Sequence, residues 1–234
     1  MTKKAIIIGA SSGIGAELSK ILAQNGYETA LCARRTELLK KISDKLPTKS
    51  SFRQIDLIDT ATSITSIKEL IRQMESVHLI VICAGTGHLN PKLDWDKEKN
   101  TIDTNVTGFC AMANTAIRYF QQQGFGHLVA ISSIARIRGN PKAPAYNASK
   151  AFVSNYMEAL RIKTKHSNIS VTDIQPGFVD TKMSKGDKLF WVSSPQKAAR
   201  QIFNAIVKKK KIAYVSKRWR LVAILLKIIP ERFL

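Results

Sequence analysis

Three side chains that could together support a proton transfer lie close to one another in the sequence. Tyr146 and Lys150 are four residues apart in the segment YNASK, a spacing that places both on one face of a helix. Lys150 should then lower the pKa of Tyr146 and make it an acid or base near neutral pH. Ser133 comes thirteen residues earlier, where its hydroxyl could hold a substrate oxygen. Alone, such a pair is usually a surface contact and such a serine a turn former.

A glycine-rich segment near the amino terminus could bind phosphate. Gly9, Gly13 and Gly15 stand in GASSGIG, after an apolar run and before an amphipathic stretch. Glycines allow a tight turn and a close approach of the backbone to phosphates, and the following helix start offers free N–H groups and a favourable dipole. The spacing predicts a pyrophosphate site, with a simple turn as the alternative.

Charged residues follow the next two apolar runs. In a dinucleotide-binding sheet, the place of Arg34 and Arg35 faces the adenosine ribose. An acidic residue there would bind the 2′-hydroxyl of NAD, whereas Arg34 suits the 2′-phosphate of NADP. Asp56 could accept a hydrogen bond from the adenine amino group. The alternatives are solvated charge at a helix start for Arg34 and a turn residue for Asp56.

These residues need a scaffold of alternating strands and helices. The expected strands are 4–9, 28–33, 52–57, 78–83, 127–132, 169–174 and 212–215. The expected helices are 13–25, a charged helix after Arg35, 61–75, 100–122, 146–166 and 195–207. Such alternation predicts a parallel sheet covered on both faces, with ligands at the carboxyl ends of the strands.

Length and composition limit the class of protein. The chain has 234 residues, enough for one α/β domain, and 44% of them are hydrophobic. Three separated cysteines exclude a disulfide scaffold, and the four scattered histidines indicate no metal site. No apolar run reaches the ~18–20 residues that span a bilayer, and no signal peptide is evident. We therefore expect a cytoplasmic protein.

The carboxyl-terminal region carries most of the positive charge. The chain has 37 Lys and Arg against 17 Asp and Glu, a formal charge of +20, and residues 182–234 contribute +12 of it. The segment 217–234 mixes Trp219 and an apolar stretch with basic residues. It could lie on an anionic membrane, cover the substrate pocket or a neighbouring subunit, or dock on its own core. Nucleic acid is not expected as a partner, because no reader motif is present.

Taken together, these motifs resemble the short-chain dehydrogenase/reductase family over residues 4 to about 207. The resemblance is carried by GASSGIG at 9–15, CAG at 83–85, Asn105 in NVTG, Ser133 in ISSIA, YNASK at 146–150 and PGFVDT at 176–181. It implies a single Rossmann-type doubly wound α/β sheet of about seven parallel strands with helices on both faces. It also implies hydride transfer with a nicotinamide cofactor.

The resemblance assigns roles to matching residues. Ser133 would polarise the substrate carbonyl, Tyr146 would donate or accept the proton, and Lys150 would bind the nicotinamide ribose. Asn105 would hold a water that connects Lys150 to solvent, and Arg34 matches the arrangement that prefers NADP. The implied cofactor-binding positions are Gly9, Ser11, Ser12, Gly13, Ile14, Gly15, Arg34, Arg35, Asp56, Leu57, Cys83, Ala84, Gly85, Tyr146, Lys150, Pro176, Gly177, Val179 and Thr181.

Two residues depart from the family pattern. Ile8 stands where the family usually has Thr, and Cys83 where it usually has Asn. Both positions help tie neighbouring strand ends in the family, so an apolar contact is expected to replace a polar link here. Cys83 could be a reactive thiol, but a small buried apolar residue is the expected role.

The sequence therefore predicts an NADP-dependent oxidoreductase of residues 1–216, acting on a carbonyl/secondary alcohol pair, followed by a basic and apolar segment, 217–234. Met183, Leu189, Phe190 and Trp191 could line a pocket for a hydrophobic substrate or pack on the last helix. Arg136 and Arg138 could meet an anionic group or be exposed. A homodimer or homotetramer through helices 100–122 and 146–166 is expected. The rival hypothesis is a non-catalytic NADP-binding protein that docks to a membrane or partner through its basic tail.

Overall fold

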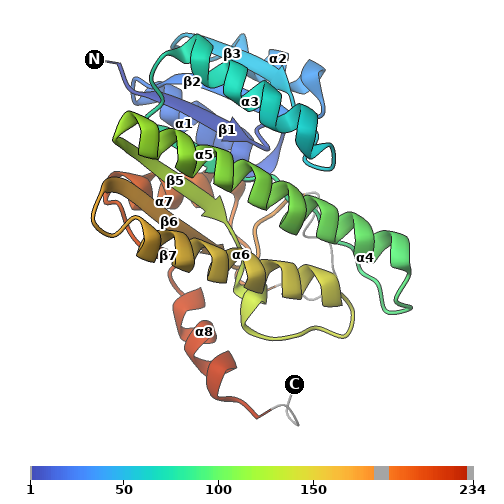
Figure 1. The fold of residues 1–234 in the computed structure, drawn as a ribbon. Helices are drawn as coiled ribbons and strands as arrows, with labels where there is room; N and C mark the ends of the chain where they lie inside the picture. Colours follow the sequence, from blue (N-terminus) through green and yellow to red (C-terminus); the bar gives the residue numbers. More distant parts are fainter. Residues whose placement is uncertain (1, 182–189, 231–234) are drawn as a thin grey trace.

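In the computed structural model, which describes residues 2–181 and 190–230, the described strands form one parallel sheet (Figure 1). The seven strands lie in the order β3-β2-β1-β4-β5-β6-β7. Their bounds are β1 Lys4–Ile8, β2 Glu28–Ala33, β3 Ser50–Gln54, β4 Leu79–Ile82, β5 Phe125–Ile131, β6 Asn168–Pro176 and β7 Ile212–Val215. The strand order reverses beside β1, because the chain runs outward to β3 and then returns to β4. The doubly wound sheet predicted from the sequence is confirmed.

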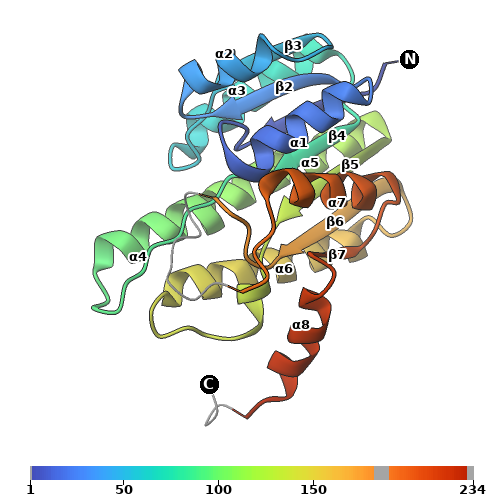
Figure 2. The ribbon, with the colours of Figure 1, turned by 180° about the vertical axis from the view of Figure 1, so that it is seen from behind.

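Helices cover both faces of the sheet (Figures 1 and 2). Helices α3, α5 and α6 pack on one face through buried side chains such as Leu70, Phe120 and Met157. Helices α1, α2 and α7 pack on the other through Leu18, Leu39 and Ile202. The bounds are α1 Gly13–Gln24, α2 Thr36–Ser43, α3 Thr60–Met74, α4 Trp95–Ile102, α5 Phe109–Gln123, α6 Pro144–Lys163, α7 Pro195–Val207 and α8 Trp219–Ile228.

The central strands are apolar on both sides because both faces are covered. Residues 5–8 of β1 are almost fully buried and alternate between the two core clusters. Such continuous apolar runs are typical of parallel sheets. They bring the strand ends, and the loops that follow them, to fixed positions.

The sequence predicted one helix over residues 100–122, and the structure differs in how this segment is divided. It is divided into α4, a π-helical turn over Asp103–Gly108, and α5. Within this turn the backbone of Leu57 approaches Gly108 so closely that a Cβ there would lie 2.4 Å from the Leu57 carbonyl oxygen. Extra residues in a helical turn are frequent at functional sites, and this one carries Asn105.

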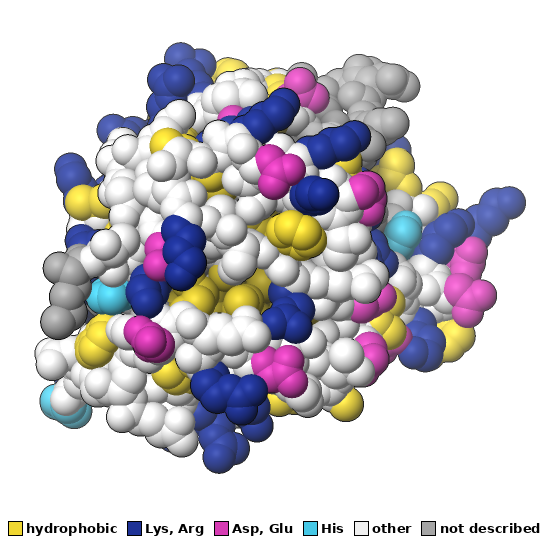
Figure 3. Space-filling view, turned by 90° about the horizontal axis from the view of Figure 1, so that it is seen from above, with side chains coloured by type: hydrophobic (Ala, Val, Ile, Leu, Met, Phe, Trp, Pro, Cys, Tyr) yellow, Lys and Arg dark blue, Asp and Glu magenta, His cyan; other side chains and the backbone are white. Residues whose placement is uncertain are grey.

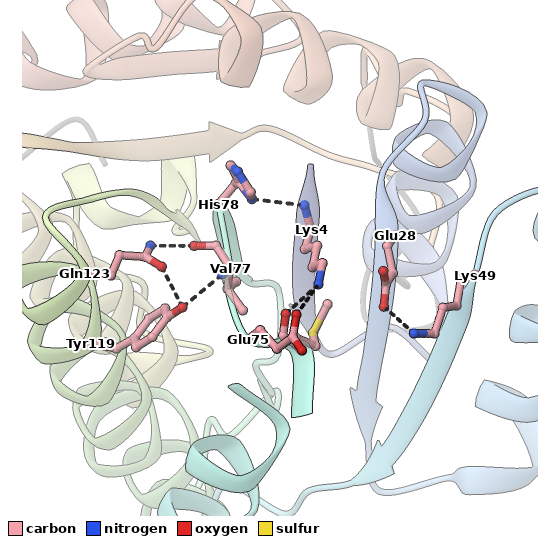
Figure 4. A network of polar contacts seen from close by, with 9 residues as sticks. Lys4, Glu28, Lys49, Glu75, Val77, His78, Tyr119 and Gln123 are labelled. Carbon is pink, nitrogen blue, oxygen red and sulfur yellow. Dashed lines mark hydrogen bonds and ion pairs between the residues drawn. The ribbon is translucent and has the colours of Figure 1, made fainter. Parts of the chain in front are cut away.

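At the amino ends of the strands, polar groups pair with one another (Figure 4). The Tyr119 hydroxyl accepts from the Val77 amide at 2.9 Å and donates to Gln123 Oε1 at 2.6 Å. The Lys4 ammonium donates to the Met74 carbonyl at 2.7 Å and lies 3.9 Å from a Glu75 carboxylate oxygen. This network closes the edge of the sheet remote from the expected ligand site.

Candidate active site

The glycine-rich segment forms the turn between β1 and α1. Gly9 and Gly13 have positive φ values of 94° and 57°, which glycine adopts without strain. A Cβ at Gly9 would lie 2.4 Å from the Ala84 amide nitrogen, and one at Gly15 would lie 2.2 Å from the Gly9 carbonyl oxygen. The side chain of Ser12, at the N-cap of α1, makes no capping hydrogen bond. The turn and the helix start therefore fit a pyrophosphate, with Ser11 and Ile14 in the same loop and first turn.

Both arginines after β2 are exposed at the rim of this turn. The Arg35 guanidinium donates to the hydroxyls of Ser11 and Ser12, each at 2.9 Å. The Arg34 carbonyl accepts from Gln54, and neither arginine forms an ion pair within the described residues. Arg35 is thus the arginine whose side chain reaches the glycine-rich turn, a detail that the sequence could not settle.

The segment after β3 lies beside the π-helical turn. Asp56 accepts from the Ile58 amide at 3.1 Å through Oδ1, as a turn residue would, and it remains partly exposed. Leu57 is buried against Gly108. The other Asp56 carboxylate oxygen has no hydrogen bond to the described residues, which leaves it able to accept from a ligand.

The ends of β1 and β4 are tied through their backbones. The amides of Cys83 and Ala84 both donate to the Ile8 carbonyl, at 2.7 and 2.9 Å. Ile8 and Cys83 pack in core clusters on opposite faces of the sheet, so the expected apolar contact between these two side chains is wrong. Burial raises the pKa of the Cys83 thiol to about 12, which keeps it protonated.

Tyr146 and Lys150 lie in the first two turns of α6. Pro144 begins the helix with a fixed φ, and the Glu98 carboxylate of α4 accepts from the Ala145 amide at 3.1 Å. This carboxylate replaces the capping group that Ala143 lacks and fixes the turn that carries Tyr146. Lys150 is buried and donates to the Ile131 carbonyl at 3.0 Å, with its Nζ atom 5.8 Å from the centroid of the Tyr146 ring.

Ser133 lies at the end of β5 and faces the tyrosine. Its hydroxyl accepts from the Ala135 amide at 3.1 Å and lies 3.5 Å from the Pro176 carbonyl. Asn147 holds the segment after Ser133 on α6, because its amide donates to the carbonyls of Ala135 and Arg138. The structure therefore brings the predicted Ser133, Tyr146 and Lys150 together.

The electrostatics differ from the expectation at Tyr146. Burial raises its pKa, and a hydrogen bond with Ser133 opposes this. The sequence predicted a net lowering of this pKa by Lys150, whereas the net shift is upward because desolvation of the buried phenol dominates. Burial also lowers the pKa of Lys150 itself to about 8, with the charge of Asp173 opposing the shift.

Asn105 is buried in the π-helical turn beside Gly85. Its Oδ1 accepts from the Thr86 amide at 2.8 Å, and its Nδ2 donates to the Thr86 carbonyl at 2.7 Å and to Ser149 Oγ at 3.0 Å. A Cβ at Gly85 would lie 3.2 Å from both Asn105 Oδ1 and Lys150 Nζ. Asn105 therefore lies near the lysine and fixes the loop after β4.

A buried carboxylate beneath the lysine was missed by the sequence analysis. Asp173 in β6 accepts from Ser132 Oγ, from Ser154 Oγ at 2.8 Å and from Gln175 Nε2 at 2.6 Å. Its side chain is almost fully buried, and its charge raises the pKa of Lys150. The signal was visible as polar residues in an otherwise apolar strand, VTDIQP.

The segment after β6 reaches back to the glycine-rich turn. The Gly177 amide donates to the Val215 carbonyl at 2.6 Å, and Val179 is buried and forms a bridge with Ser193. The Thr181 methyl group would lie 3.1 Å from a Cβ at Gly13. Thr181 therefore lies beside the glycine-rich turn, and Pro176, Gly177 and Val179 precede it in the same segment.

Trp219 is a second residue whose place the sequence did not reveal. It is 3% exposed and lies against Gly177, where a Cβ would come within 2.1 Å of the indole nitrogen. Phe190 stacks on Trp219 with ring centroids 5.1 Å apart, and Trp191 lies beside both. Of the four predicted pocket residues, Phe190 and Trp191 pack on α8, while Met183 and Leu189 lie outside the described residues.

Arg138 does not face a substrate anion. Its guanidinium donates to the carbonyls of Leu226 and Ile229, at 2.6 and 2.5 Å, and so caps the carboxyl end of α8. Arg136, in contrast, has a buried Nε with no partner in the described residues.

Within those same residues, no group of three or more His, Cys, Asp or Glu side chains could hold a metal ion.

Comparison with known proteins agrees with this arrangement. The family model described as short chain dehydrogenase matches residues 3–189. An uncharacterised oxidoreductase of Myxococcus xanthus is 33% identical over 187 residues, which cover 78% of this chain and 74% of that protein.

Solved structures share the fold at lower identity. An alcohol dehydrogenase of Thermococcus sibiricus, complexed with 5-hydroxy-NADP, has a TM-score of 0.81 and 22% identity, covering 92% of this chain and 95% of that one. A short chain dehydrogenase/reductase of Burkholderia phymatum, in complex with NAD, has a TM-score of 0.85 and 18% identity, covering 96% and 92%.

Proposed function

Since the chain belongs to the short-chain dehydrogenase/reductase family of oxidoreductases, we propose that it reduces a carbonyl compound to an alcohol with NADPH, using Tyr146 as the proton donor. One observation carries the proposal. Ser133, Tyr146 and Lys150 converge at the carboxyl edge of the sheet, where the glycine-rich turn fits a pyrophosphate. The substrate is a small carbonyl compound or secondary alcohol, and the aromatic rings beside Gly177 favour a hydrophobic one.

The residues divide the work of the reaction between them. A bound NADPH supplies the hydride that reaches the carbonyl carbon. The Ser133 hydroxyl holds the carbonyl oxygen and stabilises the negative charge that develops there. The Tyr146 hydroxyl gives its proton to that oxygen, so that a neutral alcohol leaves and a tyrosinate remains. Lys150 stabilises the tyrosinate and binds the ribose, and Asn105 lies on the route by which the proton is restored.

The protonated form of Tyr146 is the form that reduction needs. Burial keeps the phenol protonated near neutral pH, so the donor form needed for reduction is the resting form. Oxidation of an alcohol needs the phenolate, which Lys150 and the bound cofactor's charges would have to stabilise. The same site can work in both directions.

NADP is proposed over NAD because two cationic side chains stand at the rim. Arg34 and Arg35 are exposed without carboxylate partners among the described residues, and Arg35 already bonds the serines of the turn. A guanidinium binds the 2′-phosphate of NADP with charge-assisted hydrogen bonds. The structural relatives hold either cofactor, one an NADP derivative and one NAD, so these arginines carry the choice.

The test is an assay with NADPH and a panel of aldehydes and ketones, comparing wild type with Tyr146→Phe and Ser133→Ala. The proposal expects oxidation of NADPH with at least one carbonyl compound and a large loss in both variants. Equal turnover by wild type and Tyr146→Phe would contradict the assignment. Tight NADPH binding without turnover of any compound would instead favour the non-catalytic alternative.

We also propose a homodimer or homotetramer through α5 and α6. Phe152 lies on the outer face of α6, 37% exposed, and stacks on Tyr156 with centroids 5.7 Å apart. An exposed phenylalanine that stacks on a partly buried tyrosine of the same long helix suits a subunit contact. Sedimentation of Phe152→Lys against wild type would test it.

Three free cysteines fit a reducing compartment, so we place the protein in the cytoplasm.

A further inference from the structure

Helix α8 has two apolar faces rather than one. The inner face, Trp219, Val222, Ala223 and Leu226, packs on the body of the protein. The outer face, Leu221, Ile224, Leu225 and Ile228, is between 50% and 72% exposed. Both sets follow the i, i+3, i+4, i+7 spacing of one helix face. An apolar outer face of this kind indicates a partner.

The direction of the outer face is fixed by contacts of the inner one. Trp219 lies in the space left by Gly177, and Arg138 bonds the last carbonyls of the helix. Held in this way, α8 projects from the body beyond β7 (Figures 1 and 2). The outer face therefore points away from the core.

The described charged residues on α8 and just before it are all basic. Residues 190–230 contain ten Lys or Arg and no Asp or Glu, all ten exposed, but those at 208–211 precede β7, at the other end of that strand from α8. Lys217, Arg218, Arg220 and Lys227 lie on α8 or just before it. In contrast, the face seen in Figure 3, which looks from the side opposite α8, mixes basic with acidic side chains.

These charges decide between the partners that an apolar face could take. A second copy of α8 would bring two sets of basic residues together, and like charges repel. An anionic lipid surface attracts them, by about 1 kcal/mol for each Lys or Arg near it. The ten residues of α8 extend about 15 Å, too short to cross a bilayer, and no helix of the described residues meets the length and hydropathy of a span.

We infer that α8 lies flat on an anionic lipid bilayer. The outer leucines and isoleucines enter the boundary between headgroups and acyl chains, and the flanking Lys and Arg meet the lipid phosphates. Trp191, half-exposed beside Trp219, suits the same boundary. Since Trp219 touches Gly177, docking places the proposed active site next to the membrane. The inference does not depend on that site being active.

The test is flotation of the purified protein with vesicles of phosphatidylcholine alone or with 30% phosphatidylglycerol, followed over increasing salt. One double variant, Leu221→Gln with Leu225→Gln, removes apolar area from the outer face. Its matched control, Ile162→Gln with Leu89→Gln, changes two residues that are equally exposed elsewhere. A second double variant, Lys217→Gln with Arg220→Gln, is matched by Lys40→Gln with Lys41→Gln on α2. Thermal unfolding of each variant checks the fold.

The inference expects wild type to float with the anionic vesicles and to be released by salt. Both α8 variants should bind about tenfold or more weakly, and both controls should bind as wild type does. Failure to float, equal binding to neutral vesicles, or binding that survives both α8 variants would overturn it. So would a wild-type dimer that dissociates in Leu221→Gln with Leu225→Gln while no vesicle binds.

Discussion

Two tyrosines at opposite ends of the sheet differ in what their hydroxyls contact. At the amino end, Tyr119 accepts from the Val77 amide and donates to Gln123, and so all its bonding capacity goes to the protein. At the carboxyl end, the Tyr146 hydroxyl has the Ser133 hydroxyl as its one hydrogen-bond partner among the described residues. Burial raises the pKa of both phenols. A perturbed pKa alone therefore does not mark a reactive group; an incomplete set of partners does.

Two lysines repeat the contrast. Lys4 bonds the Met74 carbonyl and lies within ion-pair distance of Glu75. Lys150 is buried with the Ile131 carbonyl as its hydrogen-bond partner, and among the described residues it forms no ion pair. The protein accepts an electrostatic cost at Lys150 that it avoids at Lys4. Groups held at such cost are candidates for chemistry, and groups that are fully paired are structural.

The largest expected difference is between Tyr146→Phe and Tyr119→Phe. The first should lose about a thousandfold in kcat, because general acid catalysis contributes about 10²–10⁴. The second should keep its activity and lose about 1–3 kcal/mol of stability, because the buried Val77 amide loses its acceptor. Assays with NADPH and unfolding in urea measure both. Comparable losses of activity in the two variants would remove the distinction between the two ends.

The second largest loss of activity is expected when a methyl group is added at Gly87. A Cβ there would lie 2.6 Å from Cδ2 of Tyr146, so Gly87→Ala must displace the ring. A shift of about 1 Å can cost as much as a hundredfold, so we expect a loss of at least tenfold in kcat. Gly139→Ala is the matched control, because nothing lies within 4 Å of its Cβ position. Full activity in Gly87→Ala would show that the position of Tyr146 is not critical.

Lys150→Met should increase stability while activity falls. The folded-state pKa of about 8 lies below the ordinary 10.5, so the folded protein bears the cost of the charge fully below pH 8. As pH rises from 8 to 10.5, the folded protein loses this proton while the unfolded chain keeps it. The cost of burying the charge therefore disappears. The variant should gain about 2 kcal/mol over wild type at pH 7, with a smaller gain at pH 10. Lys4→Met should gain nothing, and equal pH dependence of both variants would contradict the account.

The smallest expected effect is a shift of the pH profile in Asp173→Asn. The Asp173 charge raises the pKa of Lys150, so its removal lowers that pKa and moves the alkaline fall in kcat to lower pH. Ser154→Ala removes one hydrogen bond to the carboxylate but keeps the charge, and should move the profile less. An unchanged pH profile of kcat in Asp173→Asn would mean that the Asp173 charge does not set the pKa of Lys150.

The scaffold was predictable because its signals are local. The apolar runs of β1, β2 and β4, and the glycines that follow the first of them, each reflect burial or φ at one place in the chain. The same holds for YNASK, since one turn of helix connects Tyr146 to Lys150. The family, the sheet and the group of Ser133, Tyr146 and Lys150 follow from such signals.

What was missed depends on contacts distant in sequence. The Asp173 network joins three elements, Arg138 caps a helix 88 residues away, and Trp219 finds its place only because Gly177 lacks a side chain. The π-helical turn that carries Asn105 packs its Gly108 against Leu57, which is distant in sequence. The pKa of Tyr146 was misjudged for a related reason: spacing gives the neighbour but not the depth of burial.

The central claim is that the carboxyl end of the sheet binds NADP through Arg34 and Arg35. A fluorescence titration with NADPH and NADH tests it directly, on wild type, Arg34→Ala with Arg35→Ala, and Lys40→Ala as a distant control. We predict at least tenfold preference for NADPH in wild type and the control, and loss of that preference in the double variant. Binding of neither nucleotide, or a preference that survives in the double variant, would contradict the account.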